Sequence, residues 1–169
     1  MIIAIDVHYR ENIAKSVSIA FDNWTDTIPH TTHIVEVHNI APYVPGQFYK
    51  RELPCILKVL EKSELSKIAL IIVDGYVILD DEGKAGLGQY VYEALDRKIP
   101  IVGVAKKSFH DNQKNVIQIF RGESKNPLYV TSIGTDLTEA AEQVKNMAGN
   151  YRFPELLKIL DQETKKLID

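Results

Sequence analysis

Four acidic residues stand at positions from which they could bind metal ions. Asp6 interrupts an apolar stretch near the start of the chain, and Asp74 directly follows the apolar run IALIIV. Glu52 and Asp161 lie in segments with helical spacing of apolar residues. A charge within an apolar strand is costly unless it is paired or binds a cation, and α/β proteins place ligands at the carboxyl ends of central strands. Taken singly, each acid also fits an ordinary position: a water-facing strand, an Asp-Gly turn or a solvated helix surface.

Together, the four acids predict a site for two divalent cations. Mg²⁺ and Mn²⁺ prefer oxygen ligands, and two such ions about 3.5–4 Å apart can hold the attacking and the leaving oxygen of a phosphoryl transfer. Lys106 ends the apolar run IVGVA and could neutralise charge on the reacting phosphorus. Taken alone, with Lys107 beside it, Lys106 is better explained as a surface lysine. The acids are far apart in the sequence, so only the fold can bring them together.

The elements that must position these residues alternate between strand and helix patterns. Apolar alternation and short apolar runs predict strands at residues 2–7, 13–21, 31–39, 68–73, 99–105, 116–120 and 128–131. Apolar residues at helical spacing predict helices at residues 48–60, 84–96, 136–147 and 154–167. The first three strands have short connections, which favours an antiparallel meander.

This order predicts an α/β fold of the ribonuclease-H-like type, with a mixed sheet flanked by helices. A flavodoxin-like order fits less well, because its strands should alternate with helices from the beginning. The length of 169 residues is that of one ordinary domain, so we expect a single domain over residues 1–169.

The charge balance limits how the chain could bind nucleic acid. Its formal net charge is −3 and its pI is near 6.0, so any such contact must rest on local basic patches. A set of basic residues could form a rim that faces phosphates, although each is equally well explained as a solvated charge. They are Lys50, Arg51, Lys106, Lys107, Arg121, Lys125, Arg152 and Lys158.

The cysteine and histidine content excludes several other classes of site. Cys55 is the only cysteine, which rules out an internal disulfide and a cysteine-based zinc cluster. The five histidines lack the HxxxH spacing of a helical zinc site. The longest apolar run, residues 68–79, is broken by Asp74, so we expect no membrane span. These features favour a soluble, cytoplasmic protein, and we expect a monomer.

One segment resembles a family motif closely. PYVPGQFYKRE, residues 42–52, is similar to the motif PY-[IV]-PG-x-x-x-x-RE of the endonuclease V family. Three further matches follow in the family's order, VDG at 73–75, PIVGVAKKSF at 100–109 and YRFPELLKILD at 151–161. IAIDVHY at the start and SIGTDLTEAAEQV at 132–144 are also similar, so the resemblance covers residues 2 to about 161.

The resemblance implies an endonuclease that depends on Mg²⁺ or Mn²⁺. It would cut the phosphodiester bond on the 3′ side of inosine, the product of adenine deamination, in DNA or RNA, and leave a 5′ phosphate. The family's metal-binding acids would fall on Asp6, Glu52, Asp74 and Asp161. The first three, with Lys106 as the family's strand-end lysine, would be catalytic.

The resemblance also implies a substrate-binding surface. The wedge that separates the strands would be residues 42–45, with Tyr43 as the inserted ring and Pro45 behind it. The pocket for the flipped base would use Gly46, Phe48, Gly75 and Gly103. Backbone without a side chain can approach a base closely, and a mispaired base costs least to flip.

The segment after Asp74 departs from the family. A second glycine, a histidine and a Pro-Arg-Arg run are usual there, but this chain reads DGYVILDDEGKAGLG. Asp80 stands at the histidine position, and Asp81 and Glu82 stand where the Pro-Arg pair is expected. Acids there would weaken the salt-sensitive grip on phosphates, while Asp80 could either add a metal ligand or repel the substrate.

The departure leaves two alternatives to an endonuclease. One is a catalytically impaired relative that binds nucleic acid without cutting it. The other is an α/β domain that binds a small ligand or a partner at its strand ends and has no affinity for nucleic acid.

Overall fold

The computed structural model describes residues 1–109 and 111–167, and for Phe48 only the backbone. The strands of the described residues are β1 (Ile2–Arg10), β2 (Ile13–Phe21), β3 (Thr31–His38), β4 (Leu70–Asp74), β5 (Ile101–Ala105), β6 (Ile117–Ile119) and β7 (Leu128–Ile133). The helices are α1 (Phe48–Leu60), the 3-10 turn η1 (Leu65–Lys67), α2 (Leu87–Ala94), α3 (Leu137–Lys145) and α4 (Glu155–Lys165).

All seven strands form one sheet in the order β3-β2-β1-β4-β5-β7-β6. The strands β1, β2 and β3 form the predicted antiparallel meander. β1, β4 and β5 run parallel to one another, and β7 and β6 return antiparallel. The sheet is therefore mixed, as predicted, and the carboxyl ends of β1, β4 and β5 lie at one edge.

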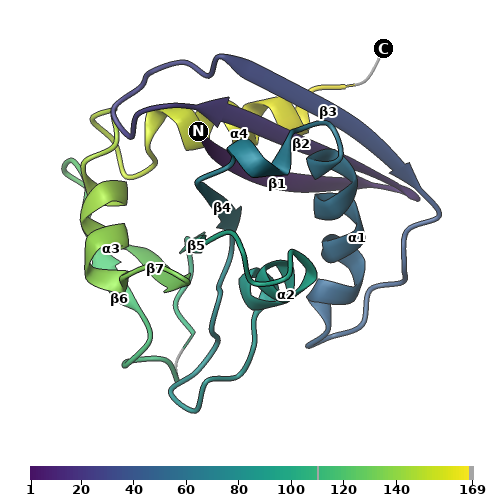
Figure 1. Cartoon of the computed structure of the whole chain (residues 1–169). Helices are drawn as coiled ribbons and strands as arrows, with labels where there is room; N and C mark the ends of the chain where they lie inside the picture. Colours follow the sequence, from purple (N-terminus) through teal and green to yellow (C-terminus); the bar gives the residue numbers. More distant parts are fainter. Residues whose placement is uncertain (110, 168–169) are drawn as a thin grey trace.

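Helices cover both faces of this sheet, α1 and α2 on one and α3 and α4 on the other (Figure 1). The two cores follow the period-2 alternation of strand side chains. In β1, Ile2 and Ala4 are buried with residues of α3 and α4, while Ile3 and Ile5 are buried with residues of α1 and α2. The central strands read as nearly continuous apolar runs because both of their faces are covered.

Some element boundaries differ from the predicted ones. The helix predicted at 84–96 begins at Leu87, because Ala85 pairs with Ile78 in a β-bridge and the Gly86 amide donates to the Val77 carbonyl at 2.8 Å. The strand predicted at 68–73 begins at Leu70, since η1 occupies the preceding residues. β1 continues to Arg10, because it pairs with β2 along its whole length. No helix in the described part of the chain has the length and apolar character needed to cross a membrane.

Candidate active site

Three of the predicted site residues reach the same edge of the sheet on the same face. Ile5 pairs with Val73 across the parallel β1 and β4, so Asp6 and Asp74 follow at matching positions. Asp74 in turn pairs with Val104 on β5, and Lys106 lies two residues beyond Val104. The even-numbered residues of these strands face α3 and α4. Register and alternation together therefore place Asp6, Asp74 and Lys106 side by side.

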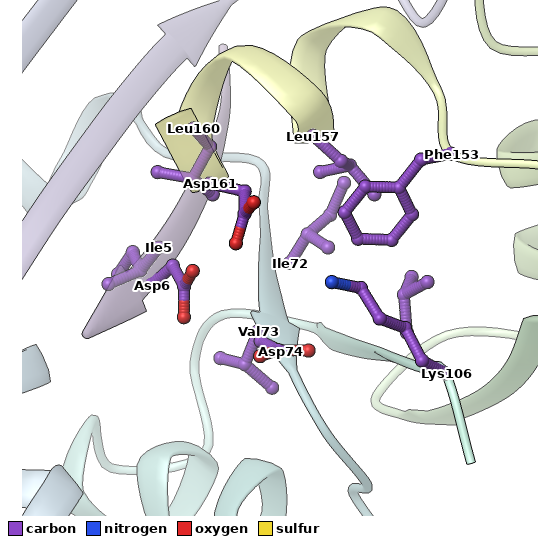
Figure 2. A pocket seen from close by; sticks show the side chains of 11 residues that line it. Ile5, Asp6, Ile72, Val73, Asp74, Lys106, Phe153, Leu157, Leu160 and Asp161 are labelled. Carbon is purple, nitrogen blue, oxygen red and sulfur yellow. The ribbon is translucent and has the colours of Figure 1, made fainter. Parts of the chain in front are cut away.

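The helix α4 adds Asp161 to this group. A cavity of ≈ 20 Å³ lies between the strand ends and α4, enough room for about one water molecule. Asp6, Asp74, Lys106 and Asp161 all line it, and Figure 2 shows their polar ends pointing toward one another. Its apolar wall includes Phe153, whose ring centroid lies 4.3 Å from Nζ of Lys106. The contact with this ring holds the ammonium at the cavity.

The sheet holds α4 in place at its C-terminal end. Leu156, Leu157 and Leu160 bury one face of the helix against the sheet. Lys15 of β2 is buried, and its ammonium donates to the carbonyls of Glu163 at 2.6 Å and Lys166 at 2.9 Å. A positive charge is favourable at the carboxyl end of a helix, where carbonyls lack intrahelical partners. These contacts fix the turn of α4 that carries Asp161.

Glu52 approaches the strand ends from the opposite side, in the second turn of α1. It lines a larger pocket of ≈ 280 Å³ next to the acid cavity. Asp74 lines both spaces, so it stands between them. The remaining wall of the larger pocket consists of Gly46, Tyr49, Gly75, Tyr76, Leu79, Ala85, Gly86, Leu87 and Phe109.

Two of the three glycines predicted for a base pocket line this pocket, and the third lies beneath it. Gly46 and Gly75 line the pocket directly, and both have the positive φ that favours glycine. Gly103 lies beneath the pocket floor, because a Cβ there would stand 2.4 Å from the Gly75 carbonyl oxygen and 2.7 Å from Oγ1 of Thr131. Gly103 therefore permits the close crossing of the segment after β4 over β5.

The predicted wedge lies on the loop that leads into the wall of this pocket. Tyr43 and Pro45 are exposed on the loop between β3 and α1, directly before Gly46. Phe48 begins α1 in the same stretch, but its side chain lies outside the described part of the structure. The loop thus brings the predicted wedge residues next to the pocket that Gly46 lines.

The acids of the site raise one another's pKa values. Burial, and then the negative charge of Asp74, raise the pKa of Asp6 to about 7. Burial, and then the charges of Asp6 and Asp74, raise the pKa of Glu52 to about 8. Solvent reaches Asp74 through the larger pocket, yet the protein atoms around its carboxylate still raise its pKa by desolvation, against the lowering effect of Lys106. The mutual effects show that the carboxylates converge without enough positive charge to balance them.

This donor set suits a hard divalent cation, because it consists of carboxylate oxygens with excess negative charge. The nearby cations include Arg51, Lys106 and Lys165, and Nζ of Lys165 lies 3.0 Å from Oδ2 of Asp161. In the described residues, no three His, Cys, Asp or Glu side chains lie close enough together to hold one ion as they stand. Binding a cation would therefore require the carboxylates to move closer together, and the positive charge of the cation would offset their repulsion.

The acids that replace the family's basic run are engaged with the backbone. Oδ1 of Asp80 accepts from the amides of Glu82 and Lys84, at 3.0 and 2.9 Å. Oδ1 of Asp81 accepts from the amides of Gln113 and Lys114, at 2.6 and 2.7 Å. Asp80 lines neither the acid cavity nor the pocket with Glu52. These acids fold the loop after β4 and tie it to the loop before β6.

Two members of the predicted basic rim have structural roles instead. Arg121 is buried, and its guanidinium donates to the carbonyls of Lys145, Met147, Gly149 and Tyr151, so its place in a phosphate-facing rim was wrongly predicted. Arg152 donates to the carbonyls of Lys106 and Pro127.

Sequence reasoning missed the aromatic wall of the larger pocket. Tyr76 donates its hydroxyl to the Lys107 carbonyl at 2.6 Å, and its ring lies 6.2 Å from that of Phe109. Tyr49 stacks on Tyr90 of α2 with 3.7 Å between centroids. A usable signal was present, because Tyr49, Tyr76 and Phe109 all lie within or beside the segments that resemble family motifs.

Comparisons with known proteins agree on one family. The family model described as Endonuclease V matches residues 1–162. An endonuclease V of Saccharolobus islandicus is 30% identical over 98% of this chain and 82% of its own length. A bifunctional methyltransferase/endonuclease of Picrophilus torridus is 31% identical over 96% of this chain and 53% of its own length.

Solved structures share the fold. A Ciona intestinalis endonuclease V, in complex with a 23mer DNA containing an inosine followed by a ribo-adenosine, has a TM-score of 0.78 at 16% identity and covers 97% of this chain and 83% of that one. The catalytic domain of human endonuclease V has a TM-score of 0.75 at 21% identity. The match covers 97% of this chain and 80% of the human one. The similarity confirms the predicted ribonuclease-H-like α/β fold.

Proposed function

Since the chain belongs to the endonuclease V family, whose members are nucleic-acid endonucleases, we propose that it cuts a phosphodiester bond on the 3′ side of inosine with Mg²⁺ or Mn²⁺. The observation that carries this proposal is that Asp6, Asp74 and Asp161 line one cavity at the strand ends, while Glu52 and Asp74 line the neighbouring pocket with its glycine and aromatic walls. The Ciona structure contains inosine-bearing DNA, which supports inosine as the substrate. We further propose that the chain acts as one domain and a monomer in the cytoplasm.

The acids supply the cation ligands in this proposal. Asp6, Asp74 and Asp161 would hold the cation from the cavity side, and Glu52 from the pocket side. A divalent cation held there would supply the chemistry that lowers the pKa of water toward neutral and so makes it a nucleophile for phosphorus. The ammonium of Lys106 lies at the same cavity and would offset the negative charge that builds up on the phosphoryl oxygens.

The larger pocket would take the flipped base. Its ≈ 280 Å³ lies just below the range of about 300–1,000 Å³ typical of small-molecule pockets, which suits a single flat ring system. The backbone at Gly46 and Gly75 leaves room for close approach, and Tyr76 and Phe109 offer ring faces. Because Asp74 and Glu52 line the same pocket, a base bound there brings its backbone phosphates to the acids.

The test is cleavage of single-stranded DNA and RNA oligonucleotides that carry one inosine, with Mg²⁺ or Mn²⁺. We expect cutting near inosine by the wild type, no cutting of matched adenosine oligonucleotides, and loss of cutting in Asp74→Asn. Asp96→Asn is the matched control, because Asp96 is exposed and has a positive φ that asparagine also adopts.

The same test separates the second candidate function. A nucleic-acid-binding protein without turnover is favoured by Asp80 at the family's histidine position, and by Asp81 and Glu82 where its Pro-Arg pair is expected. Folded wild type that binds inosine oligonucleotides but cuts neither DNA nor RNA would contradict the endonuclease and support this candidate.

A further inference from the structure

A second hollow lies outside the acid cavity and the base pocket. It has a volume of ≈ 790 Å³ and is formed by residues 122–124, between β6 and β7, and residues 149–152, between α3 and α4. The two segments touch through their backbones, since a Cβ at Gly122 would stand 2.2 Å from the Asn150 carbonyl oxygen. Asn150 and Glu123 are among the polar residues that line it.

Arg121 holds this hollow in one shape. Its side chain is buried below the segment 149–152 and donates to the Gly149 carbonyl at 3.1 Å and the Tyr151 carbonyl at 2.6 Å. It also donates to the Lys145 carbonyl at the end of α3, at 3.2 Å. A connection that lacks regular hydrogen bonding is thereby anchored at several points. The hollow is therefore preorganised, which lowers the entropy cost of binding.

An aromatic ring and an ammonium face outward at the rim of this hollow. Tyr151 is 70% exposed, and Nζ of Lys158 lies 5.9 Å from its ring centroid. Tyr151 is exposed although the backbone on both sides of it is anchored. A ring face for a base, next to a cation for a phosphate, is the arrangement with which proteins bind single-stranded nucleic acid.

A hydrogen bond links the wall of the hollow to the wall of the acid cavity. Arg152 lines the hollow and donates to the Lys106 carbonyl, while the Lys106 side chain lines the cavity. Lys158 and Asp161 are three residues apart on α4, and residues at this spacing share a helix face. A nucleic-acid strand whose phosphates lie at the acidic residues can therefore continue toward Tyr151.

The distribution of surface charge also favours a nucleic-acid path toward Tyr151 over a path toward the loop after β4. The hollow near the loop after β4 is lined by Asp80, Asp81, Glu82, Asp111 and Gln113, which would repel a polyanion. The surface toward Tyr151 instead carries Lys106, Lys107 and Lys158, with Glu123 among them.

We propose that Tyr151 and Lys158 form a nucleotide subsite for the single strand that flanks the inosine. Tyr151 stacks on one unpaired base over the hollow, and Lys158 contacts a neighbouring phosphate. This subsite rests on the proposed function, and it identifies the substrate as single-stranded beyond the cut. Its effect is on affinity, because neither side chain lines the acid cavity.

The experiment compares two inosine oligonucleotides, one with a single nucleotide on each side and one with flanks of about ten. Affinity is measured by fluorescence anisotropy in EDTA, which prevents metal-dependent cutting, and cleavage is measured separately with Mn²⁺. We expect Tyr151→Ala to weaken binding of the long oligonucleotide roughly fivefold or more, from the loss of one base–aromatic stack. Binding of the short one and kcat at saturation should be unchanged, and Tyr151→Trp should restore the affinity.

Lys158→Gln should flatten the dependence of log Kd on log salt by about 0.7, the value for one phosphate contact on a single strand. Ile28→Ala is the control, since Ile28 is 73% exposed and lies on the connection between β2 and β3. Long-oligonucleotide affinity that is unchanged in Tyr151→Ala, with wild type that cuts at inosine, overturns the subsite alone. Wild type that neither binds nor cuts any oligonucleotide overturns the subsite and the proposed function together.

Discussion

Substitution of Asp6 by asparagine should stabilise the metal-free protein at high pH while abolishing its activity. Asp6 has a pKa of about 7 in the folded protein, against the ordinary 3.8 expected in the unfolded chain. Between about pH 4 and pH 7 the folded state therefore binds more protons, so stability falls as the pH rises through this window. At roughly 1.4 kcal/mol per pH unit, the shift corresponds to about 4 kcal/mol. Because solvent partly reaches the site, and Asp74 shares the repulsion, we expect a measured effect of about 2–4 kcal/mol.

The assay is urea unfolding of wild type and Asp6→Asn in EDTA at pH 4 and pH 8. The quantity compared is the difference in the free energy of unfolding between the two proteins, so that contributions common to both cancel. We expect the free energy of unfolding of Asp6→Asn, relative to wild type, to rise by the stated amount from pH 4 to pH 8. Saturating Mg²⁺ should stabilise wild type at pH 8 and not the variant. A relative stability that does not change with pH, in Asp6→Asn as in the control Asp96→Asn, would refute the idea that burial and the charge of Asp74 raise the pKa of Asp6.

Three further substitutions test other contacts. Lys165→Ala removes the ammonium that lies 3.0 Å from Oδ2 of Asp161. It should therefore tighten the apparent Mn²⁺ affinity up to roughly fivefold, as measured by a metal titration of cleavage. An unchanged affinity would mean that Lys165 does not compete with the cation. Arg121→Lys should lower the free energy of unfolding by about 2–4 kcal/mol, because an ammonium cannot reach the several carbonyls that the guanidinium holds, and a wild-type urea midpoint would contradict this. Gly103→Ala places a Cβ 2.4 Å from the Gly75 carbonyl oxygen, so it should lower the free energy of unfolding by about 1–3 kcal/mol. It should also raise KM for inosine oligonucleotides more than it lowers kcat. Unchanged stability and KM would show that the backbone beneath the pocket can shift to accommodate the methyl group.

The part of the site carried by the strands was predictable from local pattern. Asp6, Asp74 and Lys106 each end or interrupt an apolar run, and such runs predict covered central strands. The pattern does not give the register of the strands. Only the pairing of Ile5 with Val73 shows that Asp6 and Asp74 lie at matching positions on neighbouring strands. Pairing depends on packing across the sheet, which no single segment encodes.

The structural roles of other charged residues depend on hydrogen-bond partners that the sequence pattern does not identify. Arg121 reads as one more surface cation, and its true partners are backbone carbonyls more than twenty residues away. Asp81 similarly serves amides of a distant loop at Gln113 and Lys114. Every residue has a carbonyl and almost every residue has an amide, so residue types cannot identify such partners.

The packing of α4 on β1 and β2 joins the two ends of the described chain. A chain emerging from the ribosome presents β1 first and α4 only after every other described element has been made. Until then, one side of the hairpin of β1 and β2 lacks its cover, and Asp161 has not joined Asp6 and Asp74. Such a long-range closure is slow to form in folding. The order of synthesis therefore leaves the acid centre without Asp161 until the fold around it is nearly finished.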